Sequence, residues 1–266
     1  MFEPVSVESL QPTITPTIGL SQPAAKAPET RTTLLSFSSA TTGWRATAGC
    51  TRSADLVATT DGGRSWQSVA APVPHVLRID MTGPTSGWLV GAATGCNPEF
   101  FETSDSGASW TPVAGLGQAW IVLGKDRLRL PSGTVTAPCG KHEPVKGIAP
   151  AGTQVALVVC GSGVSSTADG GASWSPVGAL PDGGHAIAAA LVPGSAGRGV
   201  ALVTGATGCG ATQVVRTASA GRTWTAGTCL TSIEPPAAVS LAADGAGLAL
   251  GAHGAARTTD AGGSWS

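Results

Sequence analysis

Short apolar runs separated by glycine-rich turns follow one another along most of this chain. The runs come in pairs, such as residues 33–37 with 44–47 and residues 76–80 with 88–91. Later pairs are residues 145–148 with 155–159, 186–191 with 200–203, and 238–241 with 248–250. The runs are rich in Val, Leu and Ala, and no segment shows the spacing of an amphipathic helix. The pattern therefore predicts an all-β fold.

An eight-residue phrase with the pattern Thr-x-Asp-x-Gly-x-Ser/Thr-Trp recurs five times. Its Asp and Trp positions are Asp61 and Trp66, Asp105 and Trp110, Asp169 and Trp174, Ser219 and Trp224, and Asp260 and Trp265. An Asp side chain accepts hydrogen bonds from backbone N–H groups just ahead of it, and Gly supplies a positive φ without steric cost. Each phrase predicts a turn between antiparallel strands, with the Trp anchoring the outgoing strand. We expect a looser turn at Ser219, because Ser makes this bond more weakly.

The phrase resembles the Asp-box, or BNR repeat, which occurs in sialidases, sortilin-type receptors, some glycoside hydrolases and the photosystem II assembly-factor family of propellers. The resemblance implies a β-propeller of four-stranded antiparallel blades, in which the residues named above are structural. Gly43-Trp44 and Gly87-Trp88 fit the second strand of the assembly-factor type. Sialidases need a Tyr nucleophile and an Arg-Ile-Pro motif, but this chain has no Tyr and offers only Leu77-Arg78-Ile79-Asp80. A conventional sialidase mechanism is therefore excluded.

The spacing of the repeated Trp residues indicates the number of blades. A four-stranded blade takes roughly 40–50 residues, and the Trp-to-Trp intervals are 44, 64, 50 and 41 residues. The excess in the long interval lies around residues 118–140. We predict five Asp-box blades with an extra hairpin in this interval. The alternative is six blades, the sixth formed by residues 114–143.

The composition changes near residue 30. Residues 31–266 hold the predicted propeller, whereas residues 1–30 hold a short alternating run and a Pro/Thr-rich linker. The last phrase ends at Trp265, so the final blade lacks most of a fourth strand. We expect residues 4–10 to supply that strand.

Charge and cysteine content exclude several classes of function. Only 12% of the residues are charged and the net charge is −1, so the chain has no basic footprint for nucleic acid. No apolar run approaches the roughly 18–20 residues of a membrane helix, and the sequence contains no signal peptide. Six cysteines in a Gly-, Thr- and Ser-rich β protein favour an extracytoplasmic, oxidising compartment. Such a location implies a leader or membrane anchor upstream of this sequence.

The repeat frame narrows the fifteen pairings that six cysteines allow. Cys209 and Cys229 lie ten residues on either side of Ser219, which makes them near cross-strand neighbours. Cys50 and Cys96 occupy matching places before the third strands of the first two blades. The predicted disulfides are Cys50–Cys96, Cys139–Cys160 and Cys209–Cys229. The alternative is that some cysteines stay reduced; no CxxC spacing supports a zinc or redox site.

Three histidines and a glutamate precede the predicted innermost strands of four blades. They are His75, His142, His185 and Glu234. Connections of this kind converge near the axis of a propeller, so these side chains are candidates for binding a metal or an anionic partner. Polar residues are also common in surface loops, and we predict no metal, no cofactor and no catalytic residue. Asp80 lies on the inner strand that follows His75 and could reach the central channel; we interpret it as a strand-end Asp bonded to the backbone.

These observations predict a non-catalytic, extracytoplasmic propeller that binds another protein or serves as an assembly scaffold. The Asp residues of the phrase are expected to hold backbone amides, so we expect a binding site on the opposite face. The alternative is a secreted carbohydrate-binding or glycoside-hydrolase-like propeller, for which Trp120 is the obvious spare aromatic. Nucleic acid is not an expected partner, and a membrane would be reached only through an upstream anchor.

Overall fold

The computed structural model describes residues 32–50, 53–140, 143–161 and 163–266. The chain divides into Met1–Thr30 and Arg31–Ser266, and only the second part contains described residues. The strand predicted at residues 4–10 and the linker after it lie outside them. Apart from one 3-10 turn, η1 (Pro181–Gly183), the regular elements of the described part are β-strands. No helix in that part is long and apolar enough to cross a membrane.

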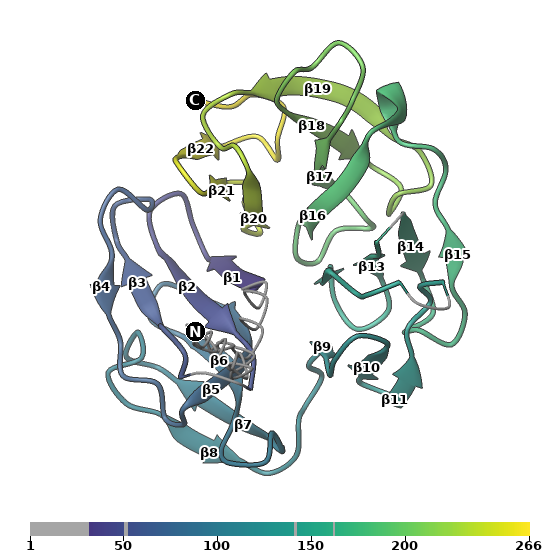
Figure 1. Cartoon of the computed structure of the whole chain (residues 1–266). Helices are drawn as coiled ribbons and strands as arrows, with labels where there is room; N and C mark the ends of the chain where they lie inside the picture. Colours follow the sequence, from purple (N-terminus) through teal and green to yellow (C-terminus); the bar gives the residue numbers. More distant parts are fainter. Residues whose placement is uncertain (1–31, 51–52, 141–142, 162) are drawn as a thin grey trace, which may run out of the picture. The chain divides into compact units, whose positions relative to one another are not determined.

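Successive antiparallel sheets, here called blades 1 to 6, follow one another along the chain (Figure 1). Blade 1 holds β1 (Thr32–Phe37), β2 (Gly43–Ala48), β3 (Val57–Thr59) and β4 (Gln67–Ser68). Blade 2 holds β5 (His75–Met81), β6 (Gly87–Ala92), β7 (Pro98–Thr103) and β8 (Thr111–Val113). Blade 3 holds β9 (Ile121–Val122), β10 (Arg127–Leu130) and β11 (Gly133–Thr136). A single parallel pair, Ala48 with Val76, joins blades 1 and 2.

The second half of the chain repeats the same order of strands. Blade 4 holds β12 (Gly147–Pro150), β13 (Ala156–Val159), β14 (Val164–Thr167) and β15 (Ser175–Pro176). Blade 5 holds β16 (His185–Leu191), β17 (Gly199–Thr204), β18 (Thr212–Thr217) and β19 (Thr225–Leu230). Blade 6 holds β20 (Pro236–Leu241), β21 (Gly247–Gly251) and β22 (Ala255–Thr258). Beyond β22, Ser266 exchanges two backbone hydrogen bonds with Arg257 at 2.8 and 3.0 Å.

The innermost strands close a ring. They contact one another in the order β1, β5, β9, β12, β16 and β20, and β20 contacts β1 again. The Phe37 N–H donates to Ser240 Oγ at 3.0 Å across this closing contact. Figure 1 shows the blades arranged around a common centre. The described part of the chain is therefore a β-propeller, as predicted.

The hydrophobic core lies between neighbouring blades rather than inside any one of them. Phe37 of blade 1 packs with Leu248 and Leu250 of blade 6. Trp44 and Leu89, both fully buried, belong to one cluster between blades 1 and 2. The central strand β13 is covered on both sides, so its residues are apolar without alternation.

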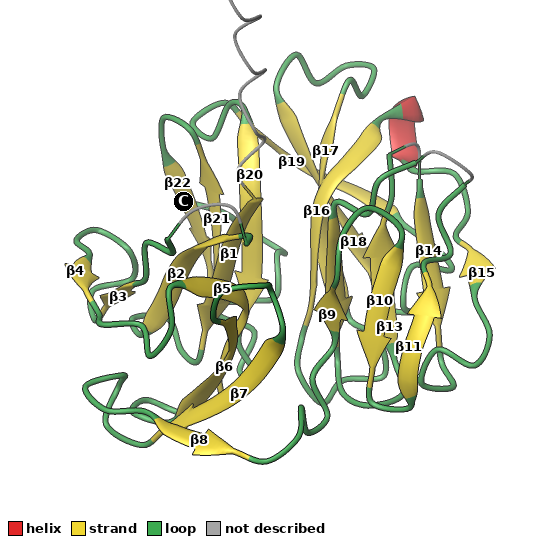
Figure 2. Ribbon diagram, turned by 60° about the horizontal axis from the view of Figure 1, so that its bottom comes forward, coloured by secondary structure: helices red, strands yellow, loops and turns green. Residues whose placement is uncertain are grey.

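The two faces of the ring carry different connections (Figure 2). The repeated phrase forms five turns at residues 59–66, 103–110, 167–174, 217–224 and 258–265, here called the repeat turns. Each repeat turn donates a backbone N–H to the loop between the first two strands of its own blade, as Gly170 does to Gln154 O at 2.9 Å. The same bond joins Gly62 to Thr41, Ser106 to Thr85, Ala220 to Gly197 and Ala261 to Gly245. We call this side the turn face.

The opposite side, here called the disulfide face, carries the connections from second to third strands and those that lead to the next blade. Antiparallel order places these connections at the other end of blades 1, 2, 4, 5 and 6. All three disulfides lie there: Cys50–Cys96, Cys139–Cys160 and Cys209–Cys229, with Cα–Cα distances of 5.6, 5.4 and 5.8 Å. These are the pairs that the repeat frame suggested, and no described cysteine is free.

Blade 3 departs from the prediction of a five-blade ring. Its inner strand β9 lies between β5 and β12, so it occupies a blade position, as in the six-blade alternative. Its strands also run in the reverse sense. Trp120 Nε1, just before β9, donates to Gly152 O on the turn face at 2.9 Å, and Val145 N, near the disulfide face, donates to Lys125 O just after β9 at 2.8 Å. The described part of the chain therefore holds five blades with a repeat turn and a sixth, reversed blade without one.

Candidate functional site

The carboxylates of the repeat turns are fully engaged in holding their own turns. Thr167 Oγ1 donates to Asp169 Oδ1 at 2.8 Å, and Ser173 donates its N–H to the same oxygen at 2.9 Å and its hydroxyl to Oδ2 at 2.5 Å. Thr167 Oγ1 in turn accepts the Gly171 N–H at 2.9 Å. The corresponding bonds form around Asp61, Asp105 and Asp260.

These bonds explain the acidity of the repeat-turn carboxyls. Hydrogen bonds from Ser109, first from its hydroxyl and then from its backbone N–H, lower the pKa of Asp105 to about 2. The same two donors of Ser173 lower the pKa of Asp169 to about 2, and the backbone N–H of Ser264 does most to lower that of Asp260 to about 2. The pKa of Asp61 is lowered in the same way. Each carboxylate is thus stabilised in its charged, hydrogen-bond-accepting form.

The fourth repeat turn keeps this frame with Ser219 in place of Asp. Ser219 Oγ accepts the Thr223 N–H at 3.0 Å and lies 3.0 Å from Thr223 Oγ1. Thr217 Oγ1 still accepts the Gly221 N–H at 2.9 Å. The hydroxyl-to-hydroxyl contact is longer than the contact of Ser173 with Asp169, and it lacks the carboxylate charge. The turn is retained with weaker bonds at its centre.

The metal candidates from the sequence do not come together within the described residues. His75 opens β5 and is half-buried, His185 opens β16 and is exposed, and His142 lies outside the described residues. Glu234 precedes β20 and accepts a hydrogen bond from Thr212 Oγ1 at 2.5 Å. In the described part of the chain, no three His, Cys, Asp or Glu side chains form a group that could hold a metal ion.

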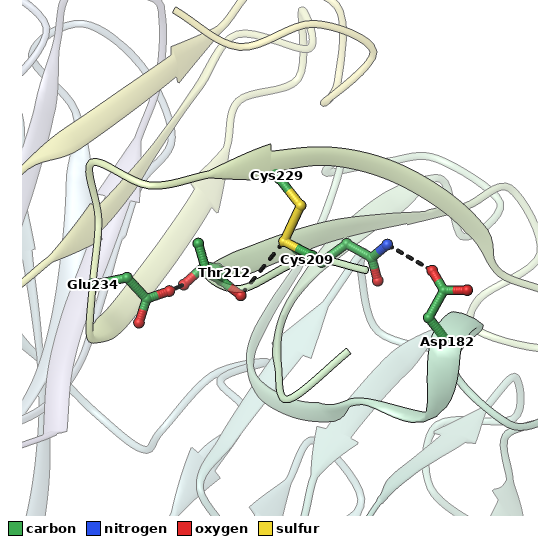
Figure 3. The surroundings of a disulfide bond; sticks show 7 residues. Asp182, Cys209, Thr212, Cys229 and Glu234 are labelled. Atoms are coloured by element: carbon green, nitrogen blue, oxygen red, sulfur yellow. Dashed lines mark hydrogen bonds between the residues drawn. A yellow bond between two sulfur atoms is a disulfide. The ribbon is translucent and has the colours of Figure 1, made fainter. Parts of the chain in front are cut away.

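Figure 3 shows that Glu234 belongs to the surroundings of the Cys209–Cys229 disulfide. Thr212, next to this disulfide, binds Glu234 on one side, and Gln213 Nε2 donates to Asp182 Oδ2 at 2.8 Å on the other. The Cys209 Sγ lies 3.5 Å from Ala211 O, which is a contact only, because a disulfide sulfur carries no hydrogen. Two carboxylates and one disulfide thus fix the loop before β18 to the connections on both sides of blade 5.

A charged pair lies on the inner strand of blade 2. Arg78 Nη1 donates to Ile148 O of β12 at 3.0 Å, and Arg78 Nη2 lies 3.9 Å from Asp80 Oδ2. The Asp80 carboxylate also accepts a hydrogen bond from Ser36 of β1, and Ser36 Oγ accepts the Met81 N–H at 2.8 Å. The pair therefore connects the inner strands of blades 1, 2 and 4.

Irregular backbone places Arg78 in this position. A β-bulge between Val76 and Arg78 inserts Leu77 as an extra residue, and bulges redirect the side chains beside them. Bulges at the same place in β16 and β20 are followed by Ala188 and Ala238, which are too short to span two blades. The inner strand of blade 3 is only the two residues Ile121–Val122, so Arg78 can extend past it to β12.

The surroundings of the pair disfavour charge. Burial raises the pKa of Asp80 against the opposing effect of Arg78, and burial lowers the pKa of Arg78 against the opposing effect of Asp80. Nevertheless, 18% of the Arg78 side chain and 32% of the Asp80 side chain remain accessible to solvent. These two groups can therefore offer hydrogen-bond donors and an acceptor to a molecule at the ring centre.

Sequence reasoning placed Asp80 on an inner strand but missed the role of Arg78. Arg78 drew notice only as part of an incomplete sialidase motif. A usable signal does exist. Among the described inner strands, β5 has an Arg at its centre and an Asp at its last-but-one position, and it precedes the interval that is too long for one blade.

Comparisons with known proteins give structural likeness alone. No protein-family model and no curated protein sequence matches the chain. A structure titled "YCF48 bound to D1 peptide" is similar at 20% identity, covering 90% of this chain and 82% of that one, with a TM-score of 0.45. YCF48 from Cyanidioschyzon merolae is similar at 14% identity, covering 85% and 81%, with a TM-score of 0.47. The GH74 xyloglucanase from Xanthomonas campestris is similar at 12% identity, covering 86% of this chain and 45% of that one, with a TM-score of 0.49.

Proposed function

We propose that this propeller is a non-catalytic, extracytoplasmic scaffold that binds another protein through its disulfide face. The observation that carries the proposal is the covalent bracing of that face by Cys50–Cys96, Cys139–Cys160 and Cys209–Cys229. Three disulfides indicate an oxidising compartment. Loops held in one conformation lose little entropy on binding, so they favour recognition of a partner.

The repeat turns support the same assignment from the opposite side. We take them to be Asp-boxes in a structural role, because each carboxylate is occupied by the backbone and hydroxyl groups of its own turn. A carboxylate with both oxygens engaged and a lowered pKa is poorly suited to accept or deliver a proton near neutral pH. Exposed polar side chains on the disulfide face, such as Lys125, Asp182 and His185, can form polar contacts with a partner.

Site-specific photocrosslinking in the organism of origin tests this proposal. A photoreactive amino acid replaces Lys125 or His185 on the disulfide face, and Arg198 or Arg222 on the turn face as matched controls; all four positions are exposed. We expect one protein to crosslink from the disulfide-face positions and not from the controls. Crosslinks to a common protein only from Arg198 and Arg222 would reject the assignment of the face. The absence of protein crosslinks together with saturable binding of a polysaccharide would replace the scaffold by the carbohydrate-binding alternative.

A further inference from the structure

Arg78 has more hydrogen-bond donors than the protein uses. A guanidinium carries five N–H groups, and among the described residues Arg78 has one acceptor within hydrogen-bond distance, Ile148 O. Its Nε is buried and has no partner in the part of the chain that the structure describes, and its Nη2 is 3.9 Å from Asp80, beyond hydrogen-bond reach. Unpaired donors in surroundings that disfavour charge cost free energy unless another molecule satisfies them.

Asp80 is the complementary acceptor. It occupies the last-but-one position of β5, where β1 has Ser36 and β20 has Ser240. Each of those serines accepts a backbone N–H from the inner strand of the next blade: Met81 N for Ser36 and Phe37 N for Ser240. The next blade after β5 is the reversed blade 3, and no such bond to Asp80 forms within the described residues. At this position the Asp80 carboxylate therefore accepts a hydrogen bond from Ser36, and the rest of the carboxylate is open to solvent.

We propose that Arg78 and Asp80 together bind a neutral amide group, such as a peptide group or the side chain of Asn or Gln. The amide oxygen accepts from Arg78 and the amide N–H donates to Asp80, which satisfies both groups at once. The proposal rests on the proposed function only for the source of the amide, a segment of the protein partner that reaches the ring centre.

Charge selects the amide over simple ions. A carboxylate would gain bonds from Arg78 but would meet the negative Asp80, and an ammonium group would meet the positive Arg78. Among the described residues of the six inner strands, the other ionisable side chains are His75 and His185, each at the first residue of its strand. The charged pair therefore stands in otherwise neutral surroundings, where its donor and acceptor are strong.

The test follows the Arg Nε–H resonances of the whole 15N-labelled protein by NMR, with acetamide as probe. The Arg78 signal is identified by its loss in Arg78→Lys. We expect acetamide to shift this signal saturably, while acetate and methylammonium leave it in place. Arg257 is the internal control, because its Nε already donates to Gly62 O at 2.7 Å; its signal should not move.

Asp80→Ser tests the contribution of the Asp80 carboxylate. Ser is a compatible replacement, since β1 and β20 carry Ser at this position. We expect acetamide binding to weaken about tenfold and acetate to begin shifting the Arg78 signal, because the opposing charge is gone. No acetamide response in the wild type would mean that Arg78 does not bind an amide and would overturn the proposal. A stronger response to ethylene glycol than to acetamide would instead indicate a sugar diol. Photocrosslinking from the disulfide face does not depend on this result, so the two proposals fail separately.

Discussion

Every repeat turn lies on one face of the ring, and every disulfide lies on the other. On the turn face, the side-chain hydrogen bonds within each repeat turn span at most four residues, such as that between Thr167 and Gly171. One further backbone bond joins each turn to a loop 16 to 23 residues earlier in its own blade. On the disulfide face, the bonds join residues 20 to 46 positions apart. The first face is held by repeated hydrogen bonds within single blades, and the second carries covalent bonds in addition.

We infer from this difference that the turn face stabilises the fold, whereas the loops of the disulfide face are available to bind a partner. Four repeat turns with the same bonds, and a fifth that keeps their frame, make the turn face similar in five of the six blades, so it offers a partner few distinguishing features. The disulfide face has connections of unequal length and composition, from the loop at Cys96 to the one at Cys209. Variable loops on a rigid frame are where proteins usually place binding residues. The comparison therefore favours the disulfide face as the recognition surface.

Among the changes that test this comparison of the two faces, removal of a disulfide is expected to have the largest effect on stability. Replacing Cys50 and Cys96 together by Ser releases a loop with a sequence separation of 46. The chain-entropy model predicts a loss of about 4 kcal/mol in the free energy of unfolding. The separations of 21 for Cys139–Cys160 and 20 for Cys209–Cys229 predict about 3 kcal/mol each. Urea unfolding of the three double variants, each with its two remaining disulfides intact, measures the order of these losses. Equal losses or a reversed order would contradict the loop-length argument.

The turn face is expected to depend most on its buried Thr residues. Thr167→Val keeps the side-chain shape but leaves the backbone N–H groups of Asp169 and Gly171 without their acceptor. Because these groups are shielded by the turn, we expect a loss of about 2 kcal/mol. Thr225→Val, at an exposed strand position, is the matched control and should change stability little. Equal losses in both variants, measured by urea unfolding, would show that the Thr167 bonds are not what holds the turn.

The repeat made much of this fold predictable. Each hairpin depends on residues within one phrase, such as Thr167, Asp169 and Gly171, so local sequence was enough to indicate strand, turn and strand. The cysteine pairs could be suggested from the same frame, because matching places in adjacent blades lie close together. Each copy of the phrase determines one hairpin, and the five copies place such a hairpin in five blades of the ring.

The reversed blade 3 and the reach of Arg78 could not be predicted in the same way. Blade 3 has no copy of the phrase, so its strand direction is decided by tertiary contacts such as that of Trp120 with Gly152. Arg78 reaches Ile148 only because a bulge at Leu77 and a two-residue β9 coincide. Neither has a local sequence signature, and both lie where the repeat is interrupted.

The smallest expected effect is also the most selective, and it concerns the one irregular repeat turn. Ser219→Asp restores the carboxylate that the other four repeat turns have. We expect a modest rise in unfolding temperature at neutral pH, because an Asp here would gain the donors that Ser173 gives to Asp169. Ser219→Asn, which is neutral and of the same shape, is the control for any effect of size.

The pH dependence of this variant decides whether the carboxylate charge is the cause. In three of the other turns, those of Asp105, Asp169 and Asp260, the folded-state pKa is lowered from 3.8 to about 2, so the folded state favours the charged form. The added stability is therefore present above pH 3.8 and is lost as the pH falls through about 2. Thermal unfolding of Ser219→Asp and wild type near neutral pH and near pH 2 measures this difference. A gain that persists unchanged at the lower pH would mean that Asp stabilises this turn by shape alone, and that the four native carboxylates do not act through their charge.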